Sequence, residues 1–386
     1  MDILKPCYYD EFECIGEKCT STCCAGWDVL IDDKTYEVYQ KLPGEFGEKL
    51  RASIDRHHQF IMRDGICSML DGMLCSVYKE IGPENMCETC KIYPREALAM
   101  KELIQLSITS SCPEVARMIM ARKDKITYEL IEEESNNIVV NHYIRKLSER
   151  DKNIYFDAMS LSIDLMQMEQ YKFYEKAMMA TMYAIHLQKC MDRKKYGEVE
   201  KLNSKYQSES YLKLLSEQMN QLTMNEFQQN DLLNDLMGSR GFKIIIGCNE
   251  QVEKRYLAFA VRMSQNPEPT IKLFRDYHQY MAERIKESEQ IYIHNIFESY
   301  MRGAEEDNMA KMVVLNNVGT IITDLLGMIY WYLDGEYSIE TRATIYSYYM
   351  KALRRNQNTS SEWYRFLCNE KYNTLPYQIS MLRLLV

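Results

Sequence analysis

The later part of the sequence is dominated by apolar residues that recur in steps of three and four. One run contains Ile154, Ala158, Leu161, Leu165 and Met168. A longer run comprises Met312, Leu315, Gly319, Ile322, Leu326, Ile329 and Leu333. Residues at this spacing lie on one face of a helix. The pattern therefore predicts that residues 121–386 form a large all-helical domain, organised as a bundle or array.

Other segments give different signals. Residues 242–246 are apolar and rich in Ile, which predicts a strand within the helical part, and residues 27–31 predict another short strand. Asp33 is the expected cap of a helix that ends near residue 42, and a second helix is expected over residues 45–58. The Cys112-Pro113 pair indicates a helix start, because proline is tolerated in the first helical turn.

The most apolar stretch, residues 312–333, is long enough to cross a membrane. It contains Asn316, Asn317 and Asp324, whose polar groups would be costly in hydrocarbon. We therefore expect a buried helix and no membrane span. The N-terminus has no apolar core of signal-peptide length, so a cytoplasmic location is expected, where thiols stay reduced.

Composition narrows the class of protein. The chain has 386 residues, of which 46% are hydrophobic and 27% charged, with only 15 Gly and 8 Pro, a mixture typical of a folded, helix-rich protein. The net charge of −9 argues against a nucleic-acid-binding surface, so no nucleic-acid partner is expected. An acidic protein can instead attract a basic partner, such as a substrate that carries lysine.

The cysteines mark a boundary along the chain. Ten of the 13 cysteines lie before residue 113, and only Cys190, Cys248 and Cys368 follow. We expect these three to be packed as small hydrophobic residues. The predicted architecture is mainly α, with a Cys-rich metal- or cluster-binding N-terminal module over residues 1–120 followed by the all-helical domain over residues 121–386.

Nine clustered cysteines indicate a metal site. They are Cys14, Cys19, Cys23, Cys24, Cys67, Cys75, Cys87, Cys90 and Cys112. Thiolates are soft ligands that bind zinc or the irons of a cluster, and two thiolates separated by two residues can reach one metal from a tight turn. The adjacent Cys23 and Cys24 point oppositely in a regular strand, which indicates two ligand sets, or one ligand and one packed thiol. No His lies near the C-x-x-C arm, so we favour a [4Fe–4S] cluster, with zinc as the alternative. Cys7 is not assigned.

The order of these motifs resembles that of the flagellin lysine-N-methylase family. The resemblance covers residues 7 to about 120 and rests on the segments Phe12-Glu13-Cys14, Cys23-Cys24-Ala25-Gly26-Trp27, Asp71-Gly72-Met73-Leu74-Cys75, Cys87-Glu88-Thr89-Cys90-Lys91-Ile92-Tyr93-Pro94-Arg95 and Ser111-Cys112-Pro113-Glu114. The Cys-Cys, C-x-x-C and Tyr-Pro pattern is also similar to a wider group of zinc- or iron-chelating proteins. Family membership implies methyl transfer from S-adenosylmethionine to lysine side chains of flagellin, and an iron–sulfur cluster held by the N-terminal cysteines.

Two residues beside the C-x-x-C arm are candidates for the reaction. Tyr93 is the candidate catalytic residue, because a tyrosine can hydrogen-bond a lysine amine. Arg95 is the candidate for cofactor binding, because a guanidinium can pair with the carboxylate of S-adenosylmethionine. Alternatively, the Tyr-Pro-Arg sequence only terminates and braces the metal loop. No Gly-rich loop follows an apolar strand, so the common doubly wound cofactor fold is not indicated. Two other classes remain open: a non-enzymatic metal- or cluster-carrying interaction protein, and a cluster-dependent oxidoreductase.

Overall fold

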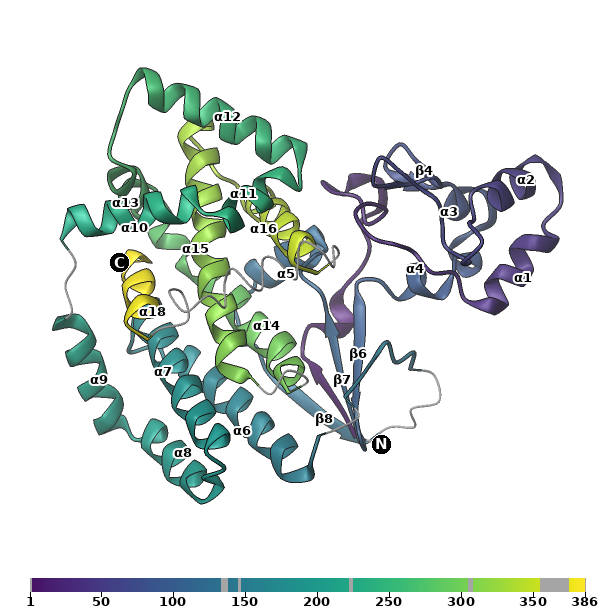
Figure 1. Cartoon of the computed structure of the whole chain (residues 1–386). Helices are drawn as coiled ribbons and strands as arrows, with labels where there is room; N and C mark the ends of the chain where they lie inside the picture. Colours follow the sequence, from purple (N-terminus) through teal and green to yellow (C-terminus); the bar gives the residue numbers. More distant parts are fainter. Residues whose placement is uncertain are drawn as a thin grey trace.

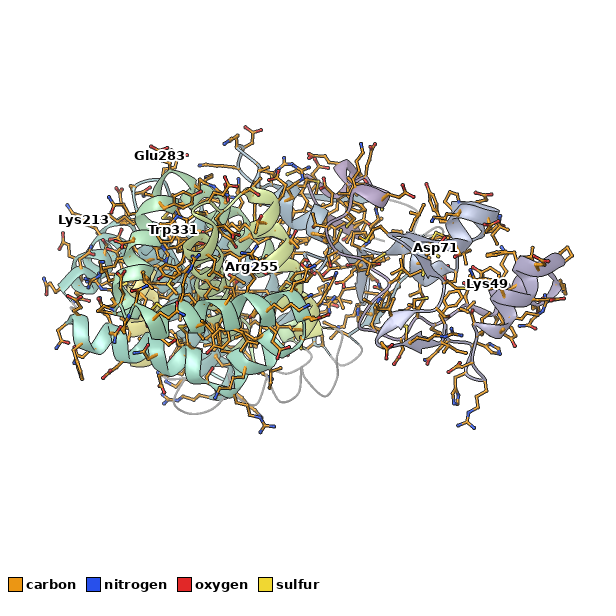
Figure 2. All side chains as sticks on the ribbon, turned by 90° about the horizontal axis from the view of Figure 1, so that it is seen from above. Lys49, Asp71, Lys213, Arg255, Glu283 and Trp331 are labelled. Atoms are coloured by element: carbon orange, nitrogen blue, oxygen red, sulfur yellow. The ribbon has the colours of Figure 1, made fainter. Side chains whose placement is uncertain are left out.

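A computed structural model describes residues 2–132, 138–144, 147–221, 225–304, 308–354 and 375–385. Figure 1 shows a small N-terminal lobe that projects from a larger helical body, with a β-sheet between the two. In the view from above, Lys49 and Asp71 lie in the lobe at one end of the molecule, and Lys213 lies at the opposite end (Figure 2).

The N-terminal lobe is built from short elements around a small apolar core. The elements are α1 (Asp33–Lys41), α2 (Gly44–Ala52), β2 (Met62–Arg63), β3 (Ile66–Cys67), β4 (Leu70–Asp71), β5 (Leu74–Cys75), α3 (Ser76–Ile81) and α4 (Glu88–Ile92). β2 pairs with β3 and β4 pairs with β5, both antiparallel. The core contains Val29, Ile31, Tyr39, Leu50, Phe60, Met69 and Val77, together with Cys67 and Cys87. Cysteines are therefore part of the packing of this lobe.

Helix α1 begins where the sequence predicts, with the cap one residue earlier than expected. The Asp32 carboxylate accepts a bond from the Thr35 N–H at 2.9 Å, so Asp32 and not Asp33 is the N-cap. Its second oxygen accepts a bond from the Glu88 N–H at 2.8 Å, which ties α1 to the start of α4. Partial burial alone would raise the pKa of Asp32, but these N–H groups hold it below its usual value.

A mixed five-stranded sheet joins the lobe to the helical body. Its order is β8-β1-β7-β6-β9, formed by β8 (Tyr128–Glu132), β1 (Asp2–Pro6), β7 (Leu103–Ile108), β6 (Arg95–Met100) and β9 (His142–Tyr143). β1 runs parallel to β7 and antiparallel to β8, and β6 and β7 form an antiparallel hairpin. Alternate side chains serve two cores, because Leu98 and Met100 join the large core of the helical body whereas Ala97 and Ala99 join a separate cluster.

The helical body contains the remaining long elements. They are α5 (Pro113–Met120), α6 (Glu149–Met166), α7 (Phe173–Asp192), α8 (Val199–Gln207), α9 (Glu209–Gln221), α10 (Glu226–Gly238), α11 (Arg240–Gly247), α12 (Glu250–Gln265), α13 (Thr270–Met281), α14 (Ile285–Gly303), α15 (Met309–Asp334), α16 (Ile339–Arg354) and α18 (Leu375–Leu382). The predicted large helical domain is thereby confirmed. The sequence places a module boundary at residue 120, yet β8 and β9 follow it and complete the sheet, while α5 precedes it and packs against α14 and α16.

Helix α15 lies at the centre of the body, as the long apolar run predicts. By length and composition it is the one helix in the described ranges that is suited to cross a membrane, but 94% of its apolar window is buried inside the protein. It contacts α7, α12, α13, α14, α16 and α18. A Cβ at Gly319 would lie 2.5 Å from the Tyr349 hydroxyl, so glycine is what allows α16 to approach this closely. The prediction of a buried helix is confirmed.

Both strands predicted from local sequence are wrong. Residues 242–246 lie in helix α11, because Ser239 caps it by accepting the Phe242 N–H at 3.1 Å and the helix buries Phe242, Ile245 and Ile246 on one face. Tertiary burial here overrides the β preference of a run of isoleucines. Residues 27–31 contribute one isolated bridge, between Leu30 and Gln59, and belong to no named strand.

A buried ionic network fixes α16 to the body. The Arg342 guanidinium lies 3.0 Å from Glu287 of α14 and 3.5 Å from Asp324 of α15, and it donates to the Ser288 hydroxyl at 2.6 Å. The side chains of Arg342 and Asp324 are only 8% and 6% exposed. Because water cannot solvate these buried charges, the ion pairs between them hold α16 in position.

Candidate metal centre

The nine clustered cysteines lie in one neighbourhood of the structure. The thiols of Cys24, Cys67, Cys75, Cys87 and Cys90 are near enough to influence one another electrostatically. Cys23 belongs to the same group, and it connects that group to the remaining three cysteines, Cys14, Cys19 and Cys112. Segments as far apart in sequence as Cys14 and Cys112, 98 positions, therefore approach one another at a patch of thiols.

Hairpins and short helices bring these thiols together. The backbone N–H of Cys67 bonds to the carbonyl of Cys24 at 2.8 Å, which sets the Cys-Cys sequence beside β3. The turn between β2 and β3 has positive φ at both Asp64 and Gly65, the geometry of the tight two-residue hairpin. This turn returns the chain so that Cys67 faces the lobe core, where it is 5% exposed.

Three of the cysteines occupy the same structural position, directly before a helix. Cys75 precedes α3, Cys87 precedes α4 and Cys112 precedes α5. Burial raises the pKa of Cys75 and raises that of Cys112 to about 12, while nearby backbone N–H groups of the following helix oppose part of this rise. Such N–H groups favour a thiolate, which is the form that binds metal.

The C-x-x-C arm holds its two sulfurs in direct interaction. The Cys90 thiol lowers the pKa of Cys87, and Cys87 together with burial raises the pKa of Cys90 well above its usual value. These opposite directions favour a thiolate at Cys87 and a thiol at Cys90. Cysteine ligands must lose their protons to bind metal, and Cys87 is the candidate for the first loss.

The adjacent cysteines differ in their surroundings. Cys23 is exposed, whereas Cys24 is half-buried and packs against the apolar core of the lobe. The neighbouring Cys23 thiol and burial both raise the pKa of Cys24. Of the two arrangements that the sequence allows, one ligand with one packed thiol agrees best with this difference.

The cysteine thiols fit a soft metal by their chemistry, but they are not arranged around a common metal position. The candidate metal ligands that converge are thiols, and several have backbone N–H groups nearby that favour the thiolate. Among the described residues, however, no three His, Cys, Asp or Glu side chains stand in position to hold one metal ion. The cysteine pairs would therefore have to close around a metal.

Tyr93 connects the motifs on either side of the thiol patch. Its hydroxyl lies 3.2 Å from the Ser111 hydroxyl, one residue before Cys112, and its ring centroid lies 5.9 Å from that of Trp27. The Trp27 indole in turn donates to the Cys23 carbonyl at 2.8 Å. The tryptophan after Cys-Cys, the Tyr-Pro-Arg sequence and the Ser-Cys-Pro-Glu sequence therefore meet around Tyr93.

Arg95 is engaged with the N-terminal segment. Its guanidinium donates to the Phe12 carbonyl at 3.2 Å and lies over the rings of Phe12 and Tyr9, at 5.4 and 5.7 Å from their centroids. These contacts attach the start of β6 to the segment that leads to Cys14. They match the bracing role that the sequence left open for Tyr-Pro-Arg.

The cysteines outside the patch have separate environments. Cys7 lies 3.7 Å from a guanidinium nitrogen of Arg122. Cys190 is partly buried, and Cys248 is exposed, so the prediction of a packed thiol is wrong for Cys248 because it lies at the exposed end of α11. Cys368 lies outside the described residues.

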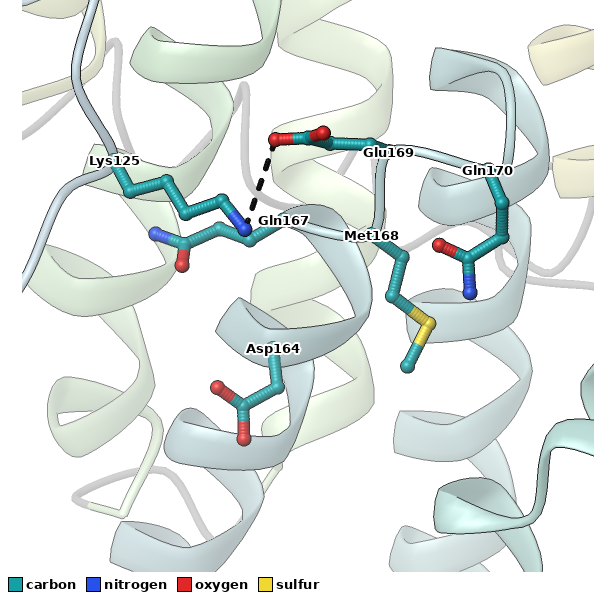
Figure 3. A pocket seen from close by; sticks show the side chains of 6 residues that line it. All are labelled: Lys125, Asp164, Gln167, Met168, Glu169 and Gln170. Carbon is teal, nitrogen blue, oxygen red and sulfur yellow. Dashed lines mark ion pairs between the residues drawn. The ribbon is translucent and has the colours of Figure 1, made fainter.

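A polar recess opens on the helical body. Lys125, Asp164, Gln167, Met168, Glu169 and Gln170 line a volume of about 380 Å³ (Figure 3). Lys125 and Glu169 form an ion pair at 3.7 Å, and partial burial raises the pKa of Asp164. Its lining is polar and its charges are largely exposed, so it can take a small polar group but provides little exclusion of water.

Two features of the molecule were not predicted from the sequence. The Tyr8 hydroxyl lies 2.7 Å from Nδ1 of the fully buried His294, whose Nε2 lies 3.4 Å from the Glu298 carboxylate. The His294 and Glu298 pair has the helical i, i+4 spacing that could have been noticed, whereas Tyr8 is 286 residues away from His294. The second feature is the contact of Lys351 with the segment after Cys19, for which no local pattern exists.

Comparison with known proteins identifies a family model and several relatives. Residues 160–381 match the family model described as the FliB lysine N-methylase C-terminal domain. The chain is 24% identical over 165 residues to the flagellar biosynthetic protein FliU of Salmonella muenchen. This alignment covers 37% of this chain and 92% of that protein. It is 26% identical over 137 residues to lysine-N-methylases of Salmonella typhimurium (strain LT2) and Salmonella choleraesuis (strain SC-B67), covering 32% of this chain.

The alignments with the lysine-N-methylases cover only part of each protein. The alignment covers 33% of each lysine-N-methylase, so this chain spans about a third of their length. No solved structure matches the chain. The family model lies in the helical body, whereas the motif resemblance rested on residues 7 to about 120, so the two lines of evidence come from different parts of the chain.

Proposed function

Because the chain belongs to the FliB lysine N-methylase family, we propose that it transfers methyl groups from S-adenosylmethionine to lysine side chains of flagellin. The observation that carries this proposal is the family match over residues 160–381, which takes in most of the helical body. Two relatives are named lysine-N-methylase, and the flagellar name of a third supports flagellin as the substrate. We place the reaction in the cytoplasm, where the many thiols stay reduced.

The reaction sets clear demands on the site. The lone pair of the lysine nitrogen attacks the methyl carbon, the carbon–sulfur bond breaks, and its electron pair remains on sulfur. Lysine has a pKa of about 10.4, so its proton must first be lost to a base or to water. Burial of the side chain favours the neutral amine. Alignment of nitrogen, carbon and sulfur, with water excluded, then supplies most of the acceleration.

Within this proposal Tyr93 hydrogen-bonds the lysine amine and Arg95 pairs with the carboxylate of S-adenosylmethionine. Tyr93 lies beside Ser111, and Arg95 is held by Phe12, so substrate contacts would replace these contacts. The same contacts support the alternative that the two residues brace the lobe.

We further propose that the clustered cysteines hold a [4Fe–4S] cluster, with zinc as the alternative. The support is a donor set made of thiols within electrostatic range of one another, with backbone N–H groups near Cys75 and Cys112. A bound cluster or metal ion would supply folding energy to a lobe whose strands are two residues long. The chain's own contribution is to gather the thiols and to favour their deprotonated form.

Calorimetric titration of S-adenosylmethionine into the full-length protein tests the methylase proposal against the carrier and redox alternatives. We expect measurable binding, weakened by Arg95→Lys because a lysine cannot form the two-pronged pair. Lys213→Met, at the far end of the molecule, is the matched control and should bind normally. Absence of binding by the wild type would contradict the proposal, whereas equal binding by Arg95→Lys would remove only the role of Arg95.

Iron, sulfide and zinc analysis of anaerobically purified protein tests the metal proposal. The wild type should contain a cluster or stoichiometric zinc, and replacement of both Cys87 and Cys90 by Ser should abolish it. Cys248→Ser is the control, because this exposed cysteine lies outside the thiol patch. Metal-free wild type, or full retention after loss of the C-x-x-C thiols, would refute this assignment.

A further inference from the structure

The segment that carries the first four clustered cysteines rests on helix α16. We call residues 14–24 the cysteine loop. The Lys351 ammonium, near the end of α16, donates to the Ser21 hydroxyl at 2.5 Å and to the Thr22 carbonyl at 2.9 Å. One cationic side chain of the helical body thus binds two successive residues of the loop, 329 and 330 positions earlier in the sequence.

A second contact lies two turns earlier on the same face of α16. The Thr344 hydroxyl lies 2.5 Å from the Thr20 hydroxyl. Thr344 and Lys351 are seven residues apart, the spacing of two helical turns, so both face the loop. The contacted residues of the loop, Thr20 to Thr22, lie between Cys19 and Cys23. The seat therefore fixes the part of the loop from which the thiols project.

The helix that provides this seat is itself held firmly. Arg342 binds α16 to α14 and α15 through the buried carboxylates of Glu287 and Asp324. α16 also packs along α5, which begins directly after Cys112. A rigid element that belongs to the family-matched region thus supports the cysteine loop from one side.

The positive charge of Lys351 can also stabilise negative charge on the nearby thiolates. A soft metal or a cluster bound by several thiolates carries excess negative charge, which a nearby cation offsets. The Lys351 ammonium is half-buried and lies within electrostatic range of the Cys19 thiol. It can therefore order the loop and at the same time compensate charge that accumulates on its sulfurs.

We propose that Lys351 is a positioning residue for the thiol patch: it seats the cysteine loop on α16 and so couples the metal affinity of the N-terminal lobe to the helical body. The second half of this inference rests on the proposed metal-binding function, whereas the seat itself does not. Coupling is reciprocal, so if loop seating strengthens metal binding, metal binding strengthens loop seating by the same factor.

Hydrogen–deuterium exchange of the full-length, metal-free protein tests the seat. Lys351→Met should speed exchange of the peptide that covers residues 14–24 by roughly ten- to hundred-fold, the factor that hydrogen bonds to a charged donor supply. Lys351→Arg, which keeps the charge, should recover much of the protection. Lys213→Met should match the wild type. Exchange within about twofold of the wild type in Lys351→Met would overturn the seat.

Titration with Co²⁺, read by its thiolate charge-transfer absorption, tests the coupling. Lys351→Met should weaken Co²⁺ binding by roughly tenfold or more, and Lys351→Arg should restore part of the affinity. Equal affinity in all three proteins would overturn the coupling. If the wild type binds no Co²⁺, the metal-binding function and the coupling both fail, and the exchange experiment still decides whether Lys351 seats the loop.

Discussion

Replacement of Arg342 by Met should be among the most destabilising single changes in the helical body. The guanidinium serves two buried carboxylates, at 3.0 Å from Glu287 and 3.5 Å from Asp324. Glu287 retains Arg284, at 2.7 Å. Among the described residues, Asp324 retains an ion-pair contact with His278, at 3.7 Å, and burial lowers the pKa of His278, which disfavours the charged form of this ring. The variant therefore leaves Asp324 buried without the permanent charge of a guanidinium.

The magnitude follows from this geometry. Two charges 3.5 Å apart attract by roughly 5 kcal/mol at an effective dielectric constant of about 20, and breaking a buried pair from one side costs about 3–5 kcal/mol. We expect Arg342→Met to lower the free energy of unfolding by that amount. Asp324→Asn combined with Arg342→Met should be about 2 kcal/mol more stable than the sum of the single losses, because it removes the stranded charge.

Urea unfolding followed by helical circular dichroism measures these differences. The control is Arg255→Met, whose ion pair with Asp334 is about 40% exposed on both sides and should be worth less than about 1 kcal/mol. A loss for Arg342→Met no larger than that of Arg255→Met would contradict this prediction, as would strict additivity in the double variant. Either outcome would mean that the network does not fix α16.

Three further predictions concern the lobe, the central helix and the thiols. Asp32→Ala should lower the free energy of unfolding of the lobe by about 1–2 kcal/mol, measured by urea unfolding. Because the pKa of Asp32 is lower in the folded state, this loss should be present at neutral pH and should shrink as the pH falls below about 4. Gly319→Ala should lower the melting temperature despite the better helix propensity of Ala, because its methyl group would meet the Tyr349 hydroxyl at a cost of about 1–3 kcal/mol; an unchanged or higher melting temperature would refute this. At pH 8, iodoacetamide should modify the exposed Cys248 well before Cys67, whose pKa burial raises to about 11, as peptide mass spectrometry will show; the reverse order would contradict the burial.

The helical body follows from periodicity, and the failures have identifiable causes. The run from Met312 to Leu333 predicts α15 because its apolar spacing extends over several turns. Residues 242–246 mislead because a run of β-branched residues is too short to distinguish a strand from a buried helix turn. The cap at Ser239 was the available signal. The five-stranded sheet joins β1 to β7 about 100 residues later, a pairing that local patterns do not encode.

In the candidate site, too, the local pattern was predictable and the long-range contacts were not. Cysteine spacing predicts a shared metal site, and short hairpins and helix starts bring these thiols within electrostatic range of one another. Among the described residues, no three of them stand around one metal position, so the ligand set stays a prediction. The partners that surround them come from distant segments: Lys351 bonds to Ser21 across 330 positions, and Tyr93 to Ser111 across 18. The contact of Arg95 with Phe12 was likewise outside the reach of sequence reasoning, which assigned Arg95 to a cofactor.

The proposed methyl transfer is tested most directly by site-resolved mass spectrometry of flagellin after incubation with the full-length protein and S-adenosylmethionine labelled in its methyl group. We expect labelled methyl groups on lysine nitrogens of flagellin, and none when either the protein or S-adenosylmethionine is left out. Flagellin lysines that stay unmodified after incubation with folded, anaerobically purified protein would contradict the assignment of methyl transfer to this chain.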